Sequence, residues 1–283
     1  MREKIGVGIV TCDRPDYLKD LLGSIDLDLI DEIVIVDDGK VPVNFDKEKY
    51  TFFKTSGRTG VGKAKNIALR HLMSKKCPHI FILEDDCIIT DNNVFKKYIE
   101  AAKVTGLKHF NFGPASPWNR IQKNPEIIGN LSKRGEASQL GEPNPKLIIR
   151  YNEDVSISLF EHIVAMFSYY HISTLEKVGL MDEDFYNAWE HVEHTLRIIN
   201  NGDYTPFWSF ADITGAENYI KEQENEKANT SLAKNEEEFM KRVHDGLNIF
   251  YKKHNTVPSM IAPTSNDLIK PKLKEIYERN KNN

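Results

Sequence analysis

Three consecutive carboxylates, Glu84-Asp85-Asp86, follow directly after an apolar run and have the clearest chemical potential in the sequence. The run HIFILEDD reads as a buried strand that ends in acid. Three carboxylates at one strand end repel one another unless a cation lies among them. A hard divalent ion, Mg²⁺ or Mn²⁺, binds one or two carboxylates together with the phosphate oxygens of a nucleotide. The cluster therefore predicts a metal-bound diphosphate, with an ordinary acidic turn as the alternative.

Polar side chains also follow two other predicted strands. The turn after the first strand holds Thr11, Asp13 and Arg14, and Asp37-Asp38 ends the second. Each group has a structural explanation as well, because Asp13 can cap the next helix and Asp37-Asp38 can form a plain turn. Acidic groups at matching strand ends nevertheless suggest contacts to a base or ribose.

Two further segments carry chemistry at predicted helix starts. Residues 60–66, GVGKAKN, offer backbone N–H groups and two lysines, including Lys65, to a phosphate or base. In WEHVEH, residues 189–194, Val192 must face inward, so Glu190 and His191 can project from the first turn and take a proton from a hydroxyl group. A zinc site using His191 and His194 is a weaker alternative, since no cysteine or third histidine lies nearby. A solvated, charged helix start is another.

The elements that must position these groups alternate between strand and helix. Strands are expected at 5–11, 32–38, 50–55 and 79–86, with helical spacing of apolar residues at 18–25 and 64–72. This alternation predicts an α/β fold with a mainly parallel central sheet flanked by helices, whose ligands bind beyond the carboxyl ends of the strands. Thr11, Asp37-Asp38 and Glu84-Asp85-Asp86 all lie at those ends.

The second half of the chain is less regular. Residues 114–145 read as a long loop before two β-like segments, 146–151 and 155–160. Helices are expected at 173–179, closed by Gly179, and at 190–200. We expect residues 1–216 to form the main α/β domain that carries the candidate site, and 217–283 to form a charged, helical extension that packs on it.

Composition narrows the classes of function. The chain has 283 residues, 40% of them hydrophobic, and a net charge of −4 with a pI near 6.2, so it has no overall attraction to nucleic acid or anionic membranes. Its three cysteines show no paired spacing, and no stretch approaches the roughly 20 apolar residues of a membrane span. With no recognisable signal sequence, the expected location is the cytoplasm.

Five segments in order resemble the GT-A fold glycosyltransferases, in particular the large family-two group. They are IVTCDRPDYLKDLLGSI, DEIVIVDDG, GVGKAKNIAL, IFILEDDC and VGLMDEDFYNAWEHVEHTLRIINNG, and they lie within about residues 5–215. The resemblance implies a GT-A fold and a transferase that moves a hexose or pentose from a nucleotide-diphosphate sugar, here a UDP-sugar, to an acceptor hydroxyl. It also implies Mn²⁺ or Mg²⁺ as cofactor.

The resemblance also implies roles for individual residues. Those expected to bind the nucleotide sugar are Thr11, Arg14, Asp38, Lys65, Glu84 and Asp85. The family motif Asp-x-Asp appears here as Glu84-x-Asp86, which makes Asp86 the expected metal ligand, with Glu84 beside it. The aspartate that often serves as the family's base is replaced by His191, so the base is Glu190 or His191, with Glu193 third. Glu190 is preferred because both inverting and retaining relatives carry a glutamate there.

Two other functions compete with this interpretation. Gly57 to Lys63 satisfies the phosphate-binding pattern G-x-x-x-x-G-K of an NTPase, but Ala64 follows where that loop needs Ser or Thr to hold Mg²⁺. A non-catalytic nucleotide-sugar-binding module is the second. A saccharide is the expected acceptor; a modified nucleic-acid base, contacted by Lys133-Arg134 and the basic residues of 270–281, is possible but not favoured.

Overall fold

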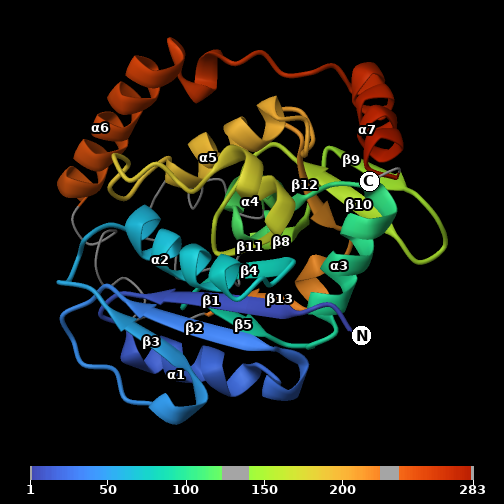
Figure 1. The fold of residues 1–283 in the computed structure, drawn as a ribbon. Helices are drawn as coiled ribbons and strands as arrows, with labels where there is room; N and C mark the ends of the chain where they lie inside the picture. The colour runs from blue at the N-terminus through green and yellow to red at the C-terminus, as the bar shows by residue number, and fades with distance from the viewer. Residues whose placement is uncertain (1, 123–139, 224–235, 282–283) are drawn as a thin grey trace.

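The computed structural model describes residues 2–122, 140–223 and 236–281, and its centre is a six-stranded sheet (Figure 1). The sheet has the order β3-β2-β1-β4-β11-β6. The strands are β1 (Ile5–Thr11), β2 (Glu32–Asp37), β3 (Thr51–Lys54), β4 (His79–Glu84), β6 (His109–Asn111) and β11 (Phe167–His171). The first four are parallel to one another, whereas β11 runs antiparallel to both β4 and β6. The predicted mainly parallel sheet is confirmed.

Helices cover both faces of this sheet. In Figure 1, α1 (Pro15–Ser24) lies on one side of β1 to β3, and α2 (Val61–Ser74) lies on the other. Helix α2 contains the whole segment 64–72 in which helical spacing was predicted, and α1 contains the segment 18–25 except for Ile25, which follows its last residue. Two later helices, α4 (Ile172–Val178) and α5 (Glu190–Asn200), end where the sequence indicates, at Gly179 and Asn201. The α/β class predicted from alternating patterns is therefore correct.

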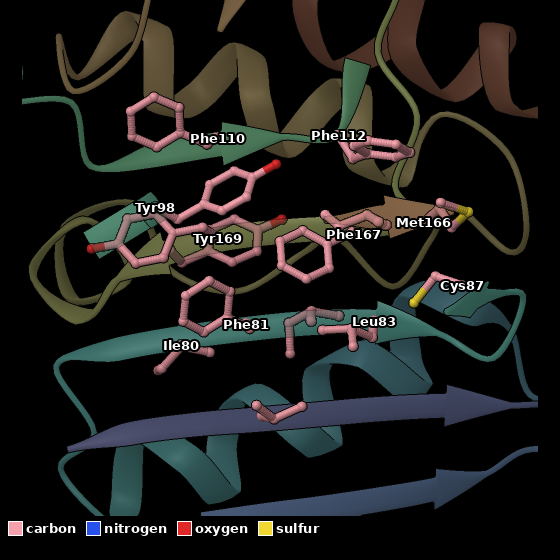
Figure 2. Packing of buried hydrophobic residues seen from close by; sticks show 14 of the residues in the cluster. Ile80, Phe81, Leu83, Cys87, Tyr98, Phe110, Phe112, Met166, Phe167 and Tyr169 are labelled. Carbon is pink, nitrogen blue, oxygen red and sulfur yellow. The ribbon is translucent and has the colours of Figure 1, made fainter. Parts of the chain in front are cut away.

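An aromatic core fills the space between the sheet and α3 (Val94–Thr105). Figure 2 shows Phe81 of β4 next to Phe167 and Tyr169 of β11, with Tyr98 of α3 close by. The Phe81 and Tyr169 ring centroids are 5.2 Å apart, and those of Tyr98 and Phe167 are 5.1 Å apart. Burying such rings contributes several kcal/mol of hydrophobic stabilisation, roughly 2–3 kcal/mol for each side chain. This packing fixes β11 against β4 and so fixes the sheet edge at which β4 ends.

A smaller antiparallel sheet lies beyond β6. Its strands are β9 (Leu147–Arg150), β10 (Ser156–Phe160) and β12 (Phe210–Ile213), in the order β12-β10-β9. Strands β9 and β10 fall inside the two segments predicted to be β-like. The expected loop at 114–145 includes two short paired strands, β7 (Arg120–Gln122) and β8 (Leu140–Pro143). Lys133-Arg134, proposed as a nucleic-acid contact, lie outside the described residues.

The C-terminal part packs on the preceding parts of the chain at several points. Strand β13 (Ile220–Glu222) pairs antiparallel with β5 (Cys87–Ile89), directly after the acidic cluster. Helix α6 (Glu236–His254) packs its buried Phe250 against Phe185, and helix α7 (Asn266–Lys281) lies against α3 (Figure 1). Within the described parts of the chain, no helix combines the length and the apolar character needed to cross a membrane.

Candidate functional site

The predicted site residues gather at the carboxyl edge of the parallel strands. Thr11 ends β1 directly opposite Asp37 of β2, and Val10 of β1 pairs with Glu84 of β4. The parallel register therefore brings the ends of three strands together, although the residues are far apart in the sequence. This arrangement is the one expected for ligand binding in an open α/β sheet.

The acidic turn after β4 is held in place by residues at the end of β1 and in the loop that follows it. The Thr11 hydroxyl donates to Asp85 Oδ2 at 2.6 Å, and the Arg14 guanidinium contacts Asp85 and also Asp86, the latter at 3.2 Å. Burial raises the pKa of Asp85 to about 7, with Arg14 acting in the opposite direction. Asp85 therefore serves as a buried support for the turn, and Arg14 is engaged by carboxylates before any ligand binds.

A residue that sequence reasoning did not identify secures the same turn. The Gln223 backbone N–H donates to the Asp86 carbonyl at 2.7 Å, and its side-chain amide donates to the Asp85 carbonyl at 2.8 Å and the Tyr17 carbonyl at 2.9 Å. Gln223 directly follows β13. Only the pairing of β13 with β5, which no local pattern indicates, brings it to the site.

Lys65 lies at the centre of the site and is completely buried. Its ammonium is 2.6 Å from Glu84 Oε1 and 3.6 Å from Glu190 Oε1. Burial lowers the pKa of a lysine, but here the charges of Glu84 and Glu190 more than compensate and raise it. Lys65 thus stays protonated and joins the acidic turn of β4 to the start of α5.

Helix α2 places Lys65 there because two glycines at its start, Gly60 and Gly62, let its backbone approach a neighbouring segment closely. A Cβ atom at Gly62 would lie 3.3 Å from both Cβ and Cγ of Glu190, and one at Gly60 would lie 2.5 Å from the Tyr186 carbonyl oxygen. Gly60 also has φ of 110°, a conformation that glycine adopts without strain. The glycines therefore allow α2 to pack directly on the segment that leads into α5.

Hydrogen bonds to the Asp38 carboxylate account for the conformation of the glycine-rich loop, so no bound phosphate is needed to explain it. Its carboxylate accepts hydrogen bonds from the backbone N–H groups of Thr59 at 2.8 Å and Gly60 at 3.0 Å, and from the Thr55 and Thr59 hydroxyls. The amide groups of Gly57, Arg58 and Val61 also donate within the chain. A phosphate-binding loop needs these amides to face the ligand, so the geometry argues against the NTPase interpretation.

The start of α5 separates its two acidic and two imidazole groups. Glu190 and His191 face the site, with His191 Nδ1 at 3.1 Å from Glu190 Oε1. Glu193 instead pairs with Arg197 and with His254 of α6, and His194 Nε2 contacts the Gly179 carbonyl at 2.9 Å. His191 and His194 are therefore engaged by different partners, and the zinc alternative gains no support.

More carboxylates than cations meet at the acidic edge. The groups are Glu84, Asp85, Asp86 and Glu190 with Arg14 and Lys65. Part of the repulsion expected from the sequence is thus relieved by the chain's own cations. The described residues contain no cluster of three or more His, Cys, Asp or Glu suited to hold a metal. Glu84 and Asp86 are 26% and 24% exposed, however, and one or two such carboxylates with phosphate oxygens fit Mg²⁺ or Mn²⁺.

Comparison with known proteins gives matches among solved structures only. No family model and no curated protein matches the sequence. The fold is similar to mannosyltransferase PcManGT from Pyrobaculum calidifontis, solved with GDP-Man and Mn²⁺, at 14% identity and a TM-score of 0.39, covering 65% of this chain and 49% of that chain. It is also similar to GalNAc-T7, solved with UDP, GalNAc and Mn²⁺, at 12% identity and a TM-score of 0.49, covering 98% and 54%. The chain spans about half the length of each structure.

Proposed function

We propose that the chain is a metal-dependent glycosyltransferase that moves a sugar from a UDP-sugar to an acceptor hydroxyl, with a saccharide as the acceptor. The observation that carries this proposal is the acidic edge itself. Four carboxylates there surround two buried or half-buried cations at the carboxyl ends of parallel strands. The choice of a UDP-sugar rests on the family resemblance, in which the first two sequence segments hold the nucleotide of a UDP-type donor.

Charge is the main reason for including a metal. A nucleoside diphosphate adds negative charge to an edge where carboxylates already outnumber cations, so the two repel each other unless a divalent cation accompanies the diphosphate. Asp86 and Glu84 would hold this ion, because their carboxylates are partly exposed while Asp85 is buried. When bound, the ion neutralises charge that develops on the departing diphosphate.

The other residues predicted to bind the donor support the loops that form the surface of the site. Thr11 and Arg14 hold the acidic turn, and Asp38 holds the loop that leads into α2. We therefore place the donor against the surface that these residues build. Lys65 keeps Glu84 and Glu190 ionised and in place, which orients the metal-side carboxylate and the acceptor-side carboxylate together.

Ligand-dependent melting tests the proposed donor class. A UDP-sugar at about 100 times its dissociation constant should stabilise the native state by about 2.7 kcal/mol, which for a chain of this size raises the melting temperature by roughly 5 °C. We expect this shift with Mn²⁺ present and its loss in EDTA. Mn²⁺ alone and ATP with Mn²⁺ are the controls. A shift produced by ATP and not by any UDP-sugar would favour an NTPase and sink the proposal.

A further inference from the structure

Glu190 and His191 form a carboxylate–imidazole pair at the start of α5, in place of a single catalytic carboxylate. We propose that Nε2 of His191 is the atom that takes the proton from the acceptor hydroxyl, and that Glu190 is a positioning residue that holds the His191 ring. This inference rests on the proposed function and deepens it. It reverses the preference for Glu190 that the family resemblance implies.

Hydrogen bonding selects the tautomer of the ring. His191 Nδ1 lies 3.1 Å from Glu190 Oε1. An ionised carboxylate only accepts hydrogen bonds, so Nδ1 carries the proton when the ring is neutral. The lone pair then resides on Nε2, where a neutral imidazole acts as a base. The pair thus presents a basic atom without any rearrangement.

The side chains of His191 and Glu190 also differ in their exposure to solvent, and this difference supports the same assignment of roles. The His191 side chain is 20% exposed, whereas that of Glu190 is 4% exposed. Lys65 approaches Glu190 Oε1 at 3.6 Å, and Gly62 of α2 packs against the glutamate side chain. An acceptor that arrives from solvent therefore meets the imidazole, while the carboxylate is enclosed by α2 and the ring.

Electrostatics agrees with this division of roles. Burial raises the pKa of Glu190, but the charge and hydrogen bond of His191, together with Lys65, lower it to about 2. A general base is most effective when its pKa lies near the working pH. Glu190 remains ionised and accepts protons poorly, which suits a group that orients a neighbour and stabilises its positive charge.

The backbone before the pair is strained and held by α6. Trp189 has φ of 74°, a left-handed conformation that is uncommon for a bulky residue. Its indole N–H donates to the Val243 carbonyl of α6 at 3.1 Å, and a Cβ atom at Gly246 would lie 2.7 Å from the indole ring. Strain of this kind persists where the surroundings fix it, commonly at functional sites. Here α6 fixes the turn that aims the pair.

The chemical step balances with these groups. The acceptor oxygen bonds to the anomeric carbon of the donor, the bond from that carbon to the phosphate oxygen breaks, and its electron pair leaves on the nucleoside diphosphate. The hydroxyl proton passes to His191 Nε2, and the resulting imidazolium is stabilised by Glu190. Other titratable groups interact with the pair from neighbouring elements: Lys65 of α2, Glu84 of β4, His109 of β6 and Tyr170 of β11.

The rate of sugar release from a UDP-sugar in Mn²⁺, with water as acceptor, tests the assignment. His191→Ala should lower the rate about a hundredfold or more with donor affinity unchanged. Glu190→Gln should lower it less, because the imidazole remains as the base and loses only the carboxylate that orients it and stabilises its positive charge. The control is His71→Ala, at the opposite edge of the sheet beside Glu32, which should leave the rate unchanged.

A second measurement does not depend on turnover. Nitrogen-15 NMR of the imidazole groups should show His191 with its proton on Nδ1 in the wild type, and this preference should weaken in Glu190→Gln. A proton on Nε2 would overturn the inference. So would a Glu190→Gln variant that is dead beside a His191→Ala variant of normal rate, an outcome that leaves the proposed function standing. A wild-type protein that releases no sugar from any UDP-sugar would overturn both.

Discussion

Replacing Asp86 by asparagine should reduce sugar transfer by about a thousandfold, the rate equivalent of roughly 4 kcal/mol of lost transition-state stabilisation. Asparagine keeps the shape of the side chain but removes the charge that would bind the divalent ion. The folded state should be little affected, because Asp86 is 24% exposed and Arg14 keeps its contact with Asp85. Removal of metal by EDTA should produce the same loss in the wild type.

The control for this experiment is Asp20→Asn, which removes one negative charge from an exposed position of α1. We expect it to retain the wild-type rate and stability. Rates are measured as sugar released per enzyme, and stability as the midpoint of urea unfolding. If Asp86→Asn, or the wild type in EDTA, keeps full activity, then the acidic edge does not act through a metal.

Lys65→Met should destabilise the protein by about 3–5 kcal/mol, which is a large part of the stability of a typical domain. The variant leaves Glu84 and Glu190 facing each other without the cation that compensates them. Removing one partner of a buried ion pair is costly because the remaining charge stays desolvated. Urea unfolding at neutral pH measures the change in free energy.

Two further variants sharpen this result. Lys63→Met removes an exposed lysine from the same helix and should cost less than about 0.5 kcal/mol. The double variant Lys65→Met with Glu190→Gln should recover part of the loss, because the glutamine no longer needs a counter-charge. Equal stability of Lys65→Met and Lys63→Met would show that Lys65 does not join the two carboxylates.

The fold could be predicted from the sequence wherever the local pattern of residue types matches the environment of those residues in the folded protein. The continuous apolar run at 5–11 becomes a central strand with the same bounds, and Gly179 ends α4 as its sequence position indicates. Strand β11 was not predicted, because its residues form a strand through pairing with β4 and β6 and not through a pattern of their own. The same holds for β13, whose partner β5 lies far away in the sequence.

The sequence was sufficient to predict which residues come together at the site. It was less informative about the contacts that each of them makes. Parallel strands bring their carboxyl ends to one edge, which places Thr11 beside Glu84 and its neighbours. The burial of Lys65 was not foreseeable, since a lysine on a helix is normally solvated and its two partners come from other elements. Asp38 supports a loop through contacts that depend on the fold of residues 55–60.

The most direct test of the central claim compares two hydrolysis reactions of the wild-type protein. A panel of UDP-sugars is assayed for released sugar and UDP, and ATP is assayed for released phosphate, each in Mn²⁺ and in EDTA. The predicted result is release of sugar from at least one UDP-sugar in Mn²⁺ only, with ATP left intact. Release of phosphate from ATP without any release of sugar would contradict the proposed glycosyltransferase, as would release of sugar that is undiminished in EDTA.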